Sequence, residues 1–402
     1  MRGVLGLGAA LGLAVAISGC GVGSSGPEAK PGHQTPQTQA SQVAAPQVSK
    51  AEIGANISDG ARNVKVSRFV KVNVTDGVLR QVTVRSHKQR LHGKLAADGS
   101  HWRALERLQP GRRYVVRGVA VDAKGLVKRY RSSFRTANLV LDQQTYPSFA
   151  PLDGSVVGIG MPVIIRFDVA VTNKAAIERH LKVLTEPHQA GAFHWISDNE
   201  VHWRPRHFWK PGTKVTVEAN IDSVPAGNGI YGQLDRTSHF TIGRGQILKV
   251  NIATHQLRVF RGGTLIRTLP VTTGAPPKYT TRSGIKVIVE KLTHTRMNSE
   301  TIGIDPNSAD GYDLNDVKWA MRLTYSGEFL HAAPWSVAYQ GNTNVSHGCT
   351  GMSTSNAKWL FDNSLVGDPV IYTGSDHWMT LDNGYGDWNA SFKDYKQGSA
   401  LN

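Results

Sequence analysis

The chain has 402 residues, a formal net charge of +16 at pH 7 and a hydrophobic content of 40%, but only two cysteines. So few cysteines exclude a scaffold that is held together by several disulfides. The roughly 350 residues after Lys50 are too many for one hydrophobic core, so we expect two or three domains there.

The N-terminal segment, residues 1–20, has the features of an export signal. Arg2 is followed by an apolar run from Val4 to Ile17, which ends in Ile17-Ser18-Gly19-Cys20. The run is too short for a comfortable transmembrane helix and has the small residues that a signal peptidase requires. The end of the run resembles a bacterial lipobox, which implies that a lipid is attached to Cys20 and anchors the protein at the outer face of the membrane. An ordinary secretory signal is the alternative.

Residues 21–50 are predicted to be a flexible linker. They consist mainly of Gly, Ser, Pro, Gln and Ala, and such a composition cannot bury enough apolar surface to offset the chain entropy. If a lipid occupies Cys20, Cys349 has no partner for an intramolecular disulfide. A lone exported thiol is better explained as a reactive group than as a structural one.

Residues 51–138 have the pattern of an immunoglobulin-like β-sandwich. Short runs of alternating apolar and polar residues, among them Val64-Lys65-Val66, are separated by turn signals such as Asp76-Gly77 and Lys124-Gly125. Period-two runs at this spacing are typical of such sandwiches.

Residues 139–243 repeat this pattern, with strands expected at 163–167, 201–204 and 214–217. A short helix is expected at 174–180, where Asn173 can cap its N-terminus. The aromatic residues Trp195, Trp203, Phe208 and Trp209 fit core packing better than a ligand platform. The fold class predicted for the whole chain is all-β.

The positive charge is concentrated in the first of these two domains. Residues 51–137 contain 19 Lys and Arg against 6 Asp and Glu, whereas residues 245–373 contain 12 against 9. Such a surplus in a cytosolic protein would suggest nucleic acid. For an exported protein we expect no nucleic acid, and the candidate partners are anionic polymers and lipid head groups of the envelope. A solvated face without a partner is the alternative.

Residues 244–374 contain the candidate catalytic residues. Strands expected at 247–252, 256–260 and 265–271 form a β-meander, and another strand is expected at 285–290. His331 and the sequence Ser346-His347-Gly348-Cys349 follow. A cysteine nucleophile needs a base that lowers the pKa of the thiol and holds a thiolate–imidazolium pair. His331 and His347 both qualify, and their spacing alone does not decide between them.

These motifs together resemble the catalytic domain of bacterial L,D-transpeptidases, often called the YkuD fold. The resemblance rests on a histidine, fourteen further residues and Ser-His-Gly-Cys, behind a meander that ends in Thr-Gly. It extends to mycobacterial members through the lipobox, two immunoglobulin-like domains, the stretch from His331 to Ser336 and the sequence Gly386-Asp387-Trp388-Asn389. The resemblance implies that a C-terminal tail, residues 375–402, packs on the preceding domains.

The resemblance also implies roles for individual residues. Cys349 would be the nucleophile, and His331 the general base, oriented by the backbone carbonyl of Ala332. The backbone amides of Gly348 and Cys349 would form an oxyanion hole, where glycine allows a close approach. The substrate cleft would be lined by His347, Ser346, Tyr312, Met297, Trp335 and Gly351.

Two positions depart from the pattern of the family. Many relatives have Asn two residues after the cysteine, where this chain has Gly351, and mycobacterial members often have Ser where this chain has Ala332. Alanine can replace this serine if only the backbone carbonyl of the residue is needed to orient His331. The missing amide is expected to change the preferred acceptor or the rate, rather than the class of reaction.

The implied activity is the cross-linking of peptidoglycan stem peptides through a cysteinyl acyl-enzyme, with no metal or cofactor. A cluster of aspartates does not fit a calcium loop and is interpreted as solvated charge on a lid; its members are Asp305, Asp310, Asp313 and Asp316. Two alternatives stay open: an L,D-carboxypeptidase that uses water as the acceptor, and a non-catalytic wall-binding scaffold. A papain-like protease is disfavoured because its cysteine precedes its histidine.

Overall fold

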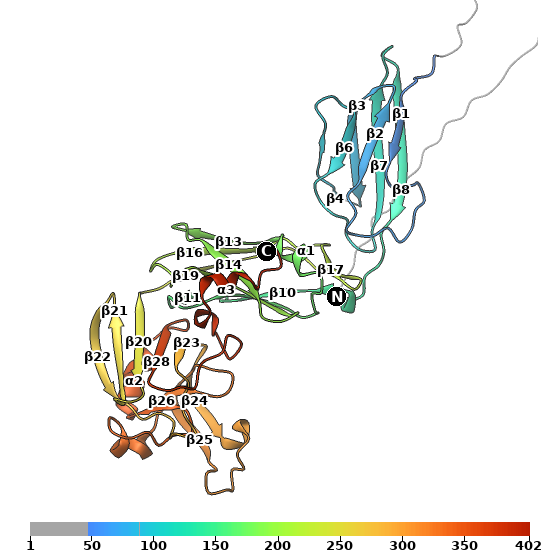
Figure 1. Ribbon diagram of the computed structural model, residues 1–402. Helices are drawn as coiled ribbons and strands as arrows, with labels where there is room; N and C mark the ends of the chain where they lie inside the picture. The colour runs from blue at the N-terminus through green and yellow to red at the C-terminus, as the bar shows by residue number, and fades with distance from the viewer. Residues whose placement is uncertain (1–46, 88) are drawn as a thin grey trace, which may run out of the picture. The chain divides into compact units, whose positions relative to one another are not determined.

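The computed structural model describes residues 47–87 and 89–402. The predicted export signal, Cys20 and most of the predicted linker lie outside the described residues. The described chain is dominated by β-strands, as the sequence predicted (Figure 1). Among the described helices, none is both long and apolar enough to cross a membrane.

The first domain is a sandwich of two four-stranded sheets. Its strands are β1 Glu52–Ala55, β2 Lys71–Thr75, β3 Val78–Ser86, β4 Gln89–Arg90, β5 Gly93–Leu95, β6 His101–Ala104, β7 Arg113–Val121 and β8 Val127–Arg135. They form sheets in the orders β1-β2-β6-β5 and β4-β3-β7-β8, and the apolar residues of their inner faces form one core. The alternating run Val64-Lys65-Val66 does not form a strand, because the chain turns directly after Val64, which makes only an isolated bridge to Thr136.

The second domain is also a β-sandwich. Its elements are the 3-10 turn Leu141–Gln143, β9 Gln144–Thr145, β10 Pro147–Ala150, β11 Val156–Val157, β12 Val163–Phe167, α1 Lys174–Glu178, β13 Leu181–Glu186, β14 Gly191–Trp195, β15 Glu200–Pro205, β16 Lys214–Ala219, β17 Pro225–Gly227, β18 Ile230–Gly232 and β19 Arg236–Ile242. Sheets β10-β12-β15-β14 and β11-β19-β16-β13 enclose its core, and β17-β18-β9 forms a small third sheet.

Two predictions for this domain are confirmed. The Asn173 side chain accepts a hydrogen bond from the Ala176 N–H at 3.3 Å and thereby caps α1, which ends two residues earlier than predicted. The rings of Trp203 and Trp209 are buried in the core with their centroids 5.4 Å apart. These aromatic rings therefore serve packing rather than a ligand platform.

The third domain is built on two further sheets. Its elements are β20 Gln246–Asn251, β21 Gln256–Arg261, β22 Thr264–Pro270, β23 Gly284–Val287, β24 Glu290–Asn298, the 3-10 turn Ser299–Ile302, β25 Asp313–Arg322, β26 Phe329–Ala332, the 3-10 segment Pro334–Tyr339, β27 Thr350–Met352, α2 Thr354–Asp362 and β28 Pro369–Thr373. The predicted meander β20-β21-β22 is confirmed within the sheet β22-β21-β20-β28-β23. The second sheet has the order β24-β25-β26-β27, and α2 packs on β25 and β26.

The single strand predicted at 285–290 is instead two strands of different sheets. β23 ends at Val287 and β24 begins at Glu290. Between them, the Ile288 N–H bonds to the Asp368 carbonyl at 3.0 Å and the Val289 N–H to the Arg322 carbonyl at 2.9 Å. The apolar run is continuous in sequence because Val287 and Ile288, where the chain passes from one sheet towards the other, are both fully buried.

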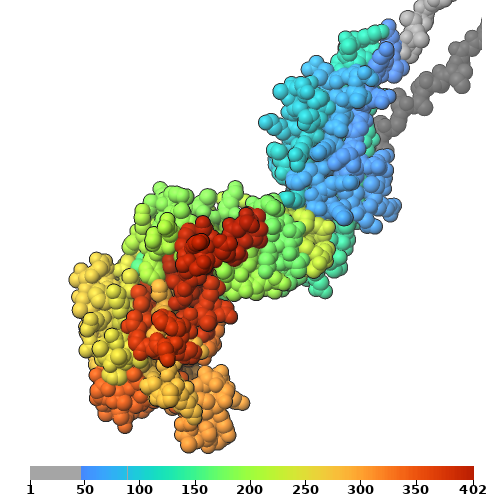
Figure 2. Space-filling model, viewed as in Figure 1, coloured from blue at the N-terminus to red at the C-terminus, as the bar shows by residue number. Residues whose placement is uncertain are grey.

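The C-terminal segment packs on the second domain through the 3-10 turn Asp387–Asn389 and the helix α3 Phe392–Lys396 (Figures 1 and 2). The guanidinium of Arg204 lies 4.8 Å from the ring centroid of Trp388 and 4.3 Å from that of Tyr395. Asp387 is fully buried and accepts hydrogen bonds from His202 Nδ1 at 2.9 Å and from the Tyr395 hydroxyl at 2.8 Å. The segment is therefore held by a buried charge as well as by aromatic packing.

The charge pair between His202 and Asp387 predicts how the docking of this segment depends on pH. Burial alone would lower the pKa of His202, but the carboxylates of Asp387 and Glu200 outweigh it and raise the pKa to about 9. Because the raised pKa exceeds the unfolded value, the pair contributes its full stabilisation below about pH 6.5, and this stabilisation is lost as the pH rises through about 9.

Asp387→Asn should weaken that pH dependence and lower the free energy of opening of the segment by about 3 kcal/mol, since it removes one of the two carboxylates, Asp387 and Glu200, that neutralise the buried His202. Hydrogen exchange of the amides in 387–396 at pH 6.5 and pH 9 measures both effects. The matched control is Asp394→Asn, an exposed carboxylate of the same segment. Equal exchange in the two variants would contradict the prediction.

Candidate active site

Parallel pairing of β26 with β27 brings His331 and Cys349 together. His331 lies directly opposite Gly351, and Cys349 precedes Gly351 by two residues. Alternate residues of an extended chain point to the same side. The side chains of His331 and Cys349 therefore share one side of the sheet, and both line the same cavity of about 320 Å³.

Most residues predicted to line a substrate cleft do surround this cavity. Met297 comes from β24, and Tyr312 directly precedes β25. The rest of the wall consists of Leu314, His331, Trp335, Val345, Ser346, His347 and Cys349. Leu314 and Val345 were not predicted; Leu314 alternates with Tyr312 at the start of a strand, a pattern that could have indicated it. Trp335 remains 56% exposed, so its ring forms an edge of the opening.

His331 is held in the orientation that a general base requires. Its side chain is buried, and Nδ1 lies 2.8 Å from the carbonyl oxygen of Ala332, to which a protonated Nδ1 donates. That bond leaves Nε2 as the acceptor nitrogen of the neutral ring. Burial lowers the pKa of His331, while the bond to Ala332 opposes the shift. The ring is therefore neutral at pH 7.

Cys349 is a neutral thiol in this arrangement. Burial raises the pKa of its thiol to about 12; the Phe329 amide, Lys286 and Arg322 act to lower it, whereas Glu328 raises it further. Sγ lies 3.4 Å from the Gly327 carbonyl oxygen. The expected thiolate–imidazolium pair is therefore not the resting state, because burial disfavours both charged forms.

His347 is placed as a wall of the cavity. Its ring centroid lies 4.4 Å from that of Tyr279 and 5.0 Å from that of Tyr312. His331 instead faces Trp335, with the two ring centroids 6.0 Å apart. The two histidines therefore differ in their surroundings: the ring of His347 lies between two tyrosines, and the ring of His331 is held by a hydrogen bond to a backbone carbonyl.

The turn before β27 is shaped by Ser346. Its hydroxyl donates to the Cys349 carbonyl at 2.6 Å and accepts from the Gly348 N–H at 3.1 Å. Gly348 has φ 125°, a conformation that favours glycine. Gly348 is buried behind the cavity rather than on its wall, and its amide, expected in an oxyanion hole, is occupied by Ser346 here.

Gly351 does not line the cavity. A Cβ at this position would lie 2.8 Å from the Cβ of Ala333 and 3.3 Å from Cγ2 of Thr272. A larger residue would therefore have to displace Ala333. Glycine at 351 is matched to the close packing of β27 on the chain that follows His331.

A buried group of charges behind Cys349 was missed from the sequence. Glu328 is 5% exposed, accepts from Arg282 at 3.1 Å, and pairs with the fully buried Lys286. The Lys286 ammonium also lies 3.8 Å from the ring centroid of Tyr372. A lysine in the apolar stretch Ile285–Val289 and a glutamate directly before Phe329 were the available signals. Of these charges, Glu328 raises the pKa of the Cys349 thiol and Lys286 lowers it.

The predicted aspartate cluster is dispersed among basic partners. Asp310 is paired with Lys278 at 2.6 Å, Asp313 with Arg296 at 2.6 Å, and Asp316 with Lys318 at 3.7 Å. These pairs lie on exposed side chains and account for three of the four carboxylates. The interpretation as solvated charge agrees with this arrangement.

Comparisons with known proteins identify the families to which two regions of the chain are similar. Residues 245–371 match the family of L,D-transpeptidase catalytic domains (YkuD), and residues 61–225 match the bacterial Ig domain family. L,D-transpeptidase 2 of Mycobacterium tuberculosis is 39% identical over 352 residues, which cover 87% of this chain and 85% of the relative. L,D-transpeptidase 5 of the same species is 34% identical and covers 86% of this chain and 76% of the relative.

A solved structure gives the same result at the level of the fold. An L,D-transpeptidase in complex with imipenem is 37% identical, with a TM-score of 0.50, over 57% of this chain and 99% of that one. The resemblance inferred from the motifs is thus confirmed at the level of the family and of the fold class. With its YkuD domain, its bacterial Ig domain and its similarity to relatives over most of their length, the chain belongs to the L,D-transpeptidase family.

Proposed function

We propose that this L,D-transpeptidase cross-links peptidoglycan stem peptides through a thioester on Cys349. The observation that carries the proposal is the placement of His331 and Cys349 on one side of paired parallel strands, at one cavity, with Nδ1 of His331 tied to the Ala332 carbonyl. A base with a fixed tautomer beside a thiol is the arrangement that cysteine acyl transfer needs.

The acylation step follows from the neutral resting state. The thiol transfers its proton to Nε2 of His331 as Sγ attacks the carbonyl of the third residue of a tetrapeptide stem. The imidazolium then gives that proton to the amine of the departing terminal D-alanine. Because both groups begin neutral, charge separation develops during the attack rather than before it.

The tetrahedral intermediate needs donors for its oxyanion. The Gly348 amide can supply one only after the Ser346 hydroxyl has released it. Deacylation reverses the roles: the side-chain amine of a neighbouring stem attacks the thioester, gives a proton to His331, and the thiol is regenerated. The product is a cross-link between third residues, and neither step requires a metal or cofactor. Met297, Tyr312, Trp335 and His347 would hold the donor stem in the cavity.

Incubation with a disaccharide-tetrapeptide tests the proposal. The expected products are a protein mass increased by the tripeptide-bearing donor, and a cross-linked dimer together with free D-alanine. Release of the tripeptide with no dimer would assign the protein as an L,D-carboxypeptidase, in which water is the acceptor. No adduct and no product would leave the wall-binding scaffold as the remaining alternative.

The lipid anchor is proposed from the sequence Ile17-Ser18-Gly19-Cys20. Cys20→Ala should release the protein from the membrane fraction, since a lipidated thiol is the proposed attachment, while the rate of acylation of Cys349 stays unchanged. Fractionation and mass measurement of the mature N-terminus check this prediction. A wild-type N-terminus without lipid would contradict the anchor but not the transpeptidase.

A further inference from the structure

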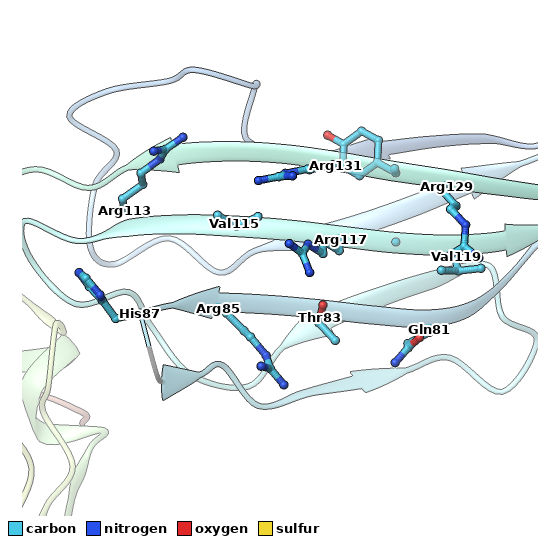
Figure 3. A pocket seen from close by; sticks show the side chains of 12 residues that line it. Gln81, Thr83, Arg85, His87, Arg113, Val115, Arg117, Val119, Arg129 and Arg131 are labelled. Carbon is cyan, nitrogen blue, oxygen red and sulfur yellow. The ribbon is translucent and has the colours of Figure 1, made fainter. Parts of the chain in front are cut away.

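The outer face of the sheet β4-β3-β7-β8 carries a row of arginines that the transpeptidase reaction does not use. Arg85 lies on β3, Arg113 and Arg117 lie on β7, and Arg129 and Arg131 lie on β8; all five side chains are exposed. They line a shallow trough of about 850 Å³ on the first domain. Figure 3 shows the arginines spread along neighbouring strands, with the short side chains of Thr83, Val115 and Val119 between them.

The register of this sheet places like charges next to one another. Arg117 lies directly opposite Arg131 on the neighbouring strand. The next pair on the same face, two residues along each strand, is Val119 with Arg129. Like charges that face each other across a strand pair destabilise a sheet. The sheet therefore carries a cost in electrostatic energy that a bound anion would remove.

None of the five arginines has a carboxylate partner within ion-pair distance in the part of the chain that the structure describes. Other arginines differ: Arg166 pairs with Glu200, Arg282 with Glu328, and Arg296 with Asp313. The positive charge of this trough is therefore not neutralised by ion pairs among residues 47–87 and 89–402. Uncompensated guanidinium groups in a concave surface focus the potential on whatever enters it.

The chemistry of the lining indicates the kind of anion. All five cations are arginines, whose planar fork binds phosphate oxygens in a bidentate manner. Side chains two residues apart on a strand are about 7 Å apart, so Arg129 and Arg131 can contact charges that repeat along a chain. We propose that this trough binds a linear polymer of the cell envelope whose units are joined by phosphodiester groups.

A membrane surface fits the trough less well. None of the exposed large apolar side chains among the described residues lines it, so it offers no group that would insert between lipids. A concave surface also contacts a single polymer chain over more of its arginines than it contacts a flat layer of head groups. The proposal goes beyond the transpeptidase reaction and does not depend on Cys349.

The test measures binding of the full-length chain, with Cys20→Ala to prevent lipid attachment, to a fluorescent oligomer of glycerol phosphate. Arg117→Thr with Arg131→Thr should weaken binding by at least about tenfold and reduce the slope of log affinity against log salt by about 2. The matched control, Arg62→Thr with Arg68→Thr, removes the same charge from exposed positions outside the trough. It should change the affinity by less than about twofold at 0.15 M salt.

Circular dichroism establishes that both double variants are folded, and Arg85→Thr with Arg129→Thr replaces the first pair if it is not. No binding by the parent chain, or an equal loss in the control, would overturn the proposal. Vesicles of phosphatidylcholine with phosphatidylglycerol form the second arm of the experiment. Binding to these vesicles alone, lost in the Arg117/Arg131 variant, would assign the trough to the membrane and would also overturn it.

Discussion

Treatment with a carbapenem should add one drug mass to the wild-type protein and none to Cys349→Ala. Carbapenems contain a strained amide that a cysteine nucleophile can open, and the sulfur then forms a thioester to the opened ring while the ring nitrogen takes the proton. Cys349 and His331 line the same cavity, so the acceptor of the thiol proton is in place when the drug is bound. Intact-mass measurement gives the result directly.

The same experiment separates a catalytic thiol from one that is merely accessible. A pKa of about 12 for Cys349 leaves roughly one thiolate in 10⁵ at pH 7. A small alkylating agent that makes no use of His331 should therefore react slowly, whereas the carbapenem should react in a saturable manner. A folded, reduced wild-type protein that stays unmodified by the drug would contradict the proposed activity. Fast alkylation combined with no carbapenem adduct would indicate an accessible thiol without a working site.

The sequence predicted the parts of this molecule whose information is local. Turn signals such as Asp76-Gly77 and Lys124-Gly125 fall between strands of the first domain, and Asn173 caps α1. The strand at 163–167 is found at the predicted residues because its apolar run is bounded on both sides by turns. The prediction fails at 285–290, where one apolar run crosses between two sheets. Hydrophobicity reports burial, and it does not report which sheet buries the residue.

The candidate active site shows the same division between features that are local in the sequence and features that depend on the fold. Family motifs indicated His331, Cys349 and much of the cavity wall. The protonation state was missed, because it depends on burial and on charges distant in sequence. Lys286 lies 63 positions before Cys349 and Glu328 lies 21 before it, and each acts on the pKa of the thiol. Only the fold brings these side chains together, so no spacing rule along the chain could have found them.

Gly351 gives a further case of this kind. The sequence marked it as a departure that removes an amide from the substrate side. The structure adds that a Cβ at 351 would approach Ala333 to 2.8 Å, so the small residues at 333 and 351 are matched where β27 packs against the chain that follows β26. Two requirements therefore compete at position 351: packing against Ala333 favours glycine, and recognition of the substrate favours a side-chain amide. Only the second requirement can be inferred from the sequence alone.

His331→Ala should lower the rate of acylation by at least about a hundredfold, the usual scale for the loss of a general base. His347→Ala is the matched control, because it removes an imidazole from the same cavity wall but leaves the hydrogen bond from Nδ1 of His331 to Ala332 intact. We expect a milder loss in the control, through the contacts of its ring with Tyr279 and Tyr312.

The dependence on pH distinguishes a base from a residue that only supports the structure. The pKa of His331 is lowered by burial, and the base acts when neutral, so the wild-type rate should fall only below about pH 6.5 and stay level above it. In His331→Ala the rate should instead climb steadily from pH 7 towards pH 10, because the reaction then depends on the small fraction of thiolate set by a pKa of about 12. His347→Ala should keep the wild-type profile. If His331→Ala kept that level profile while His347→Ala lost it, the role of base would pass to His347.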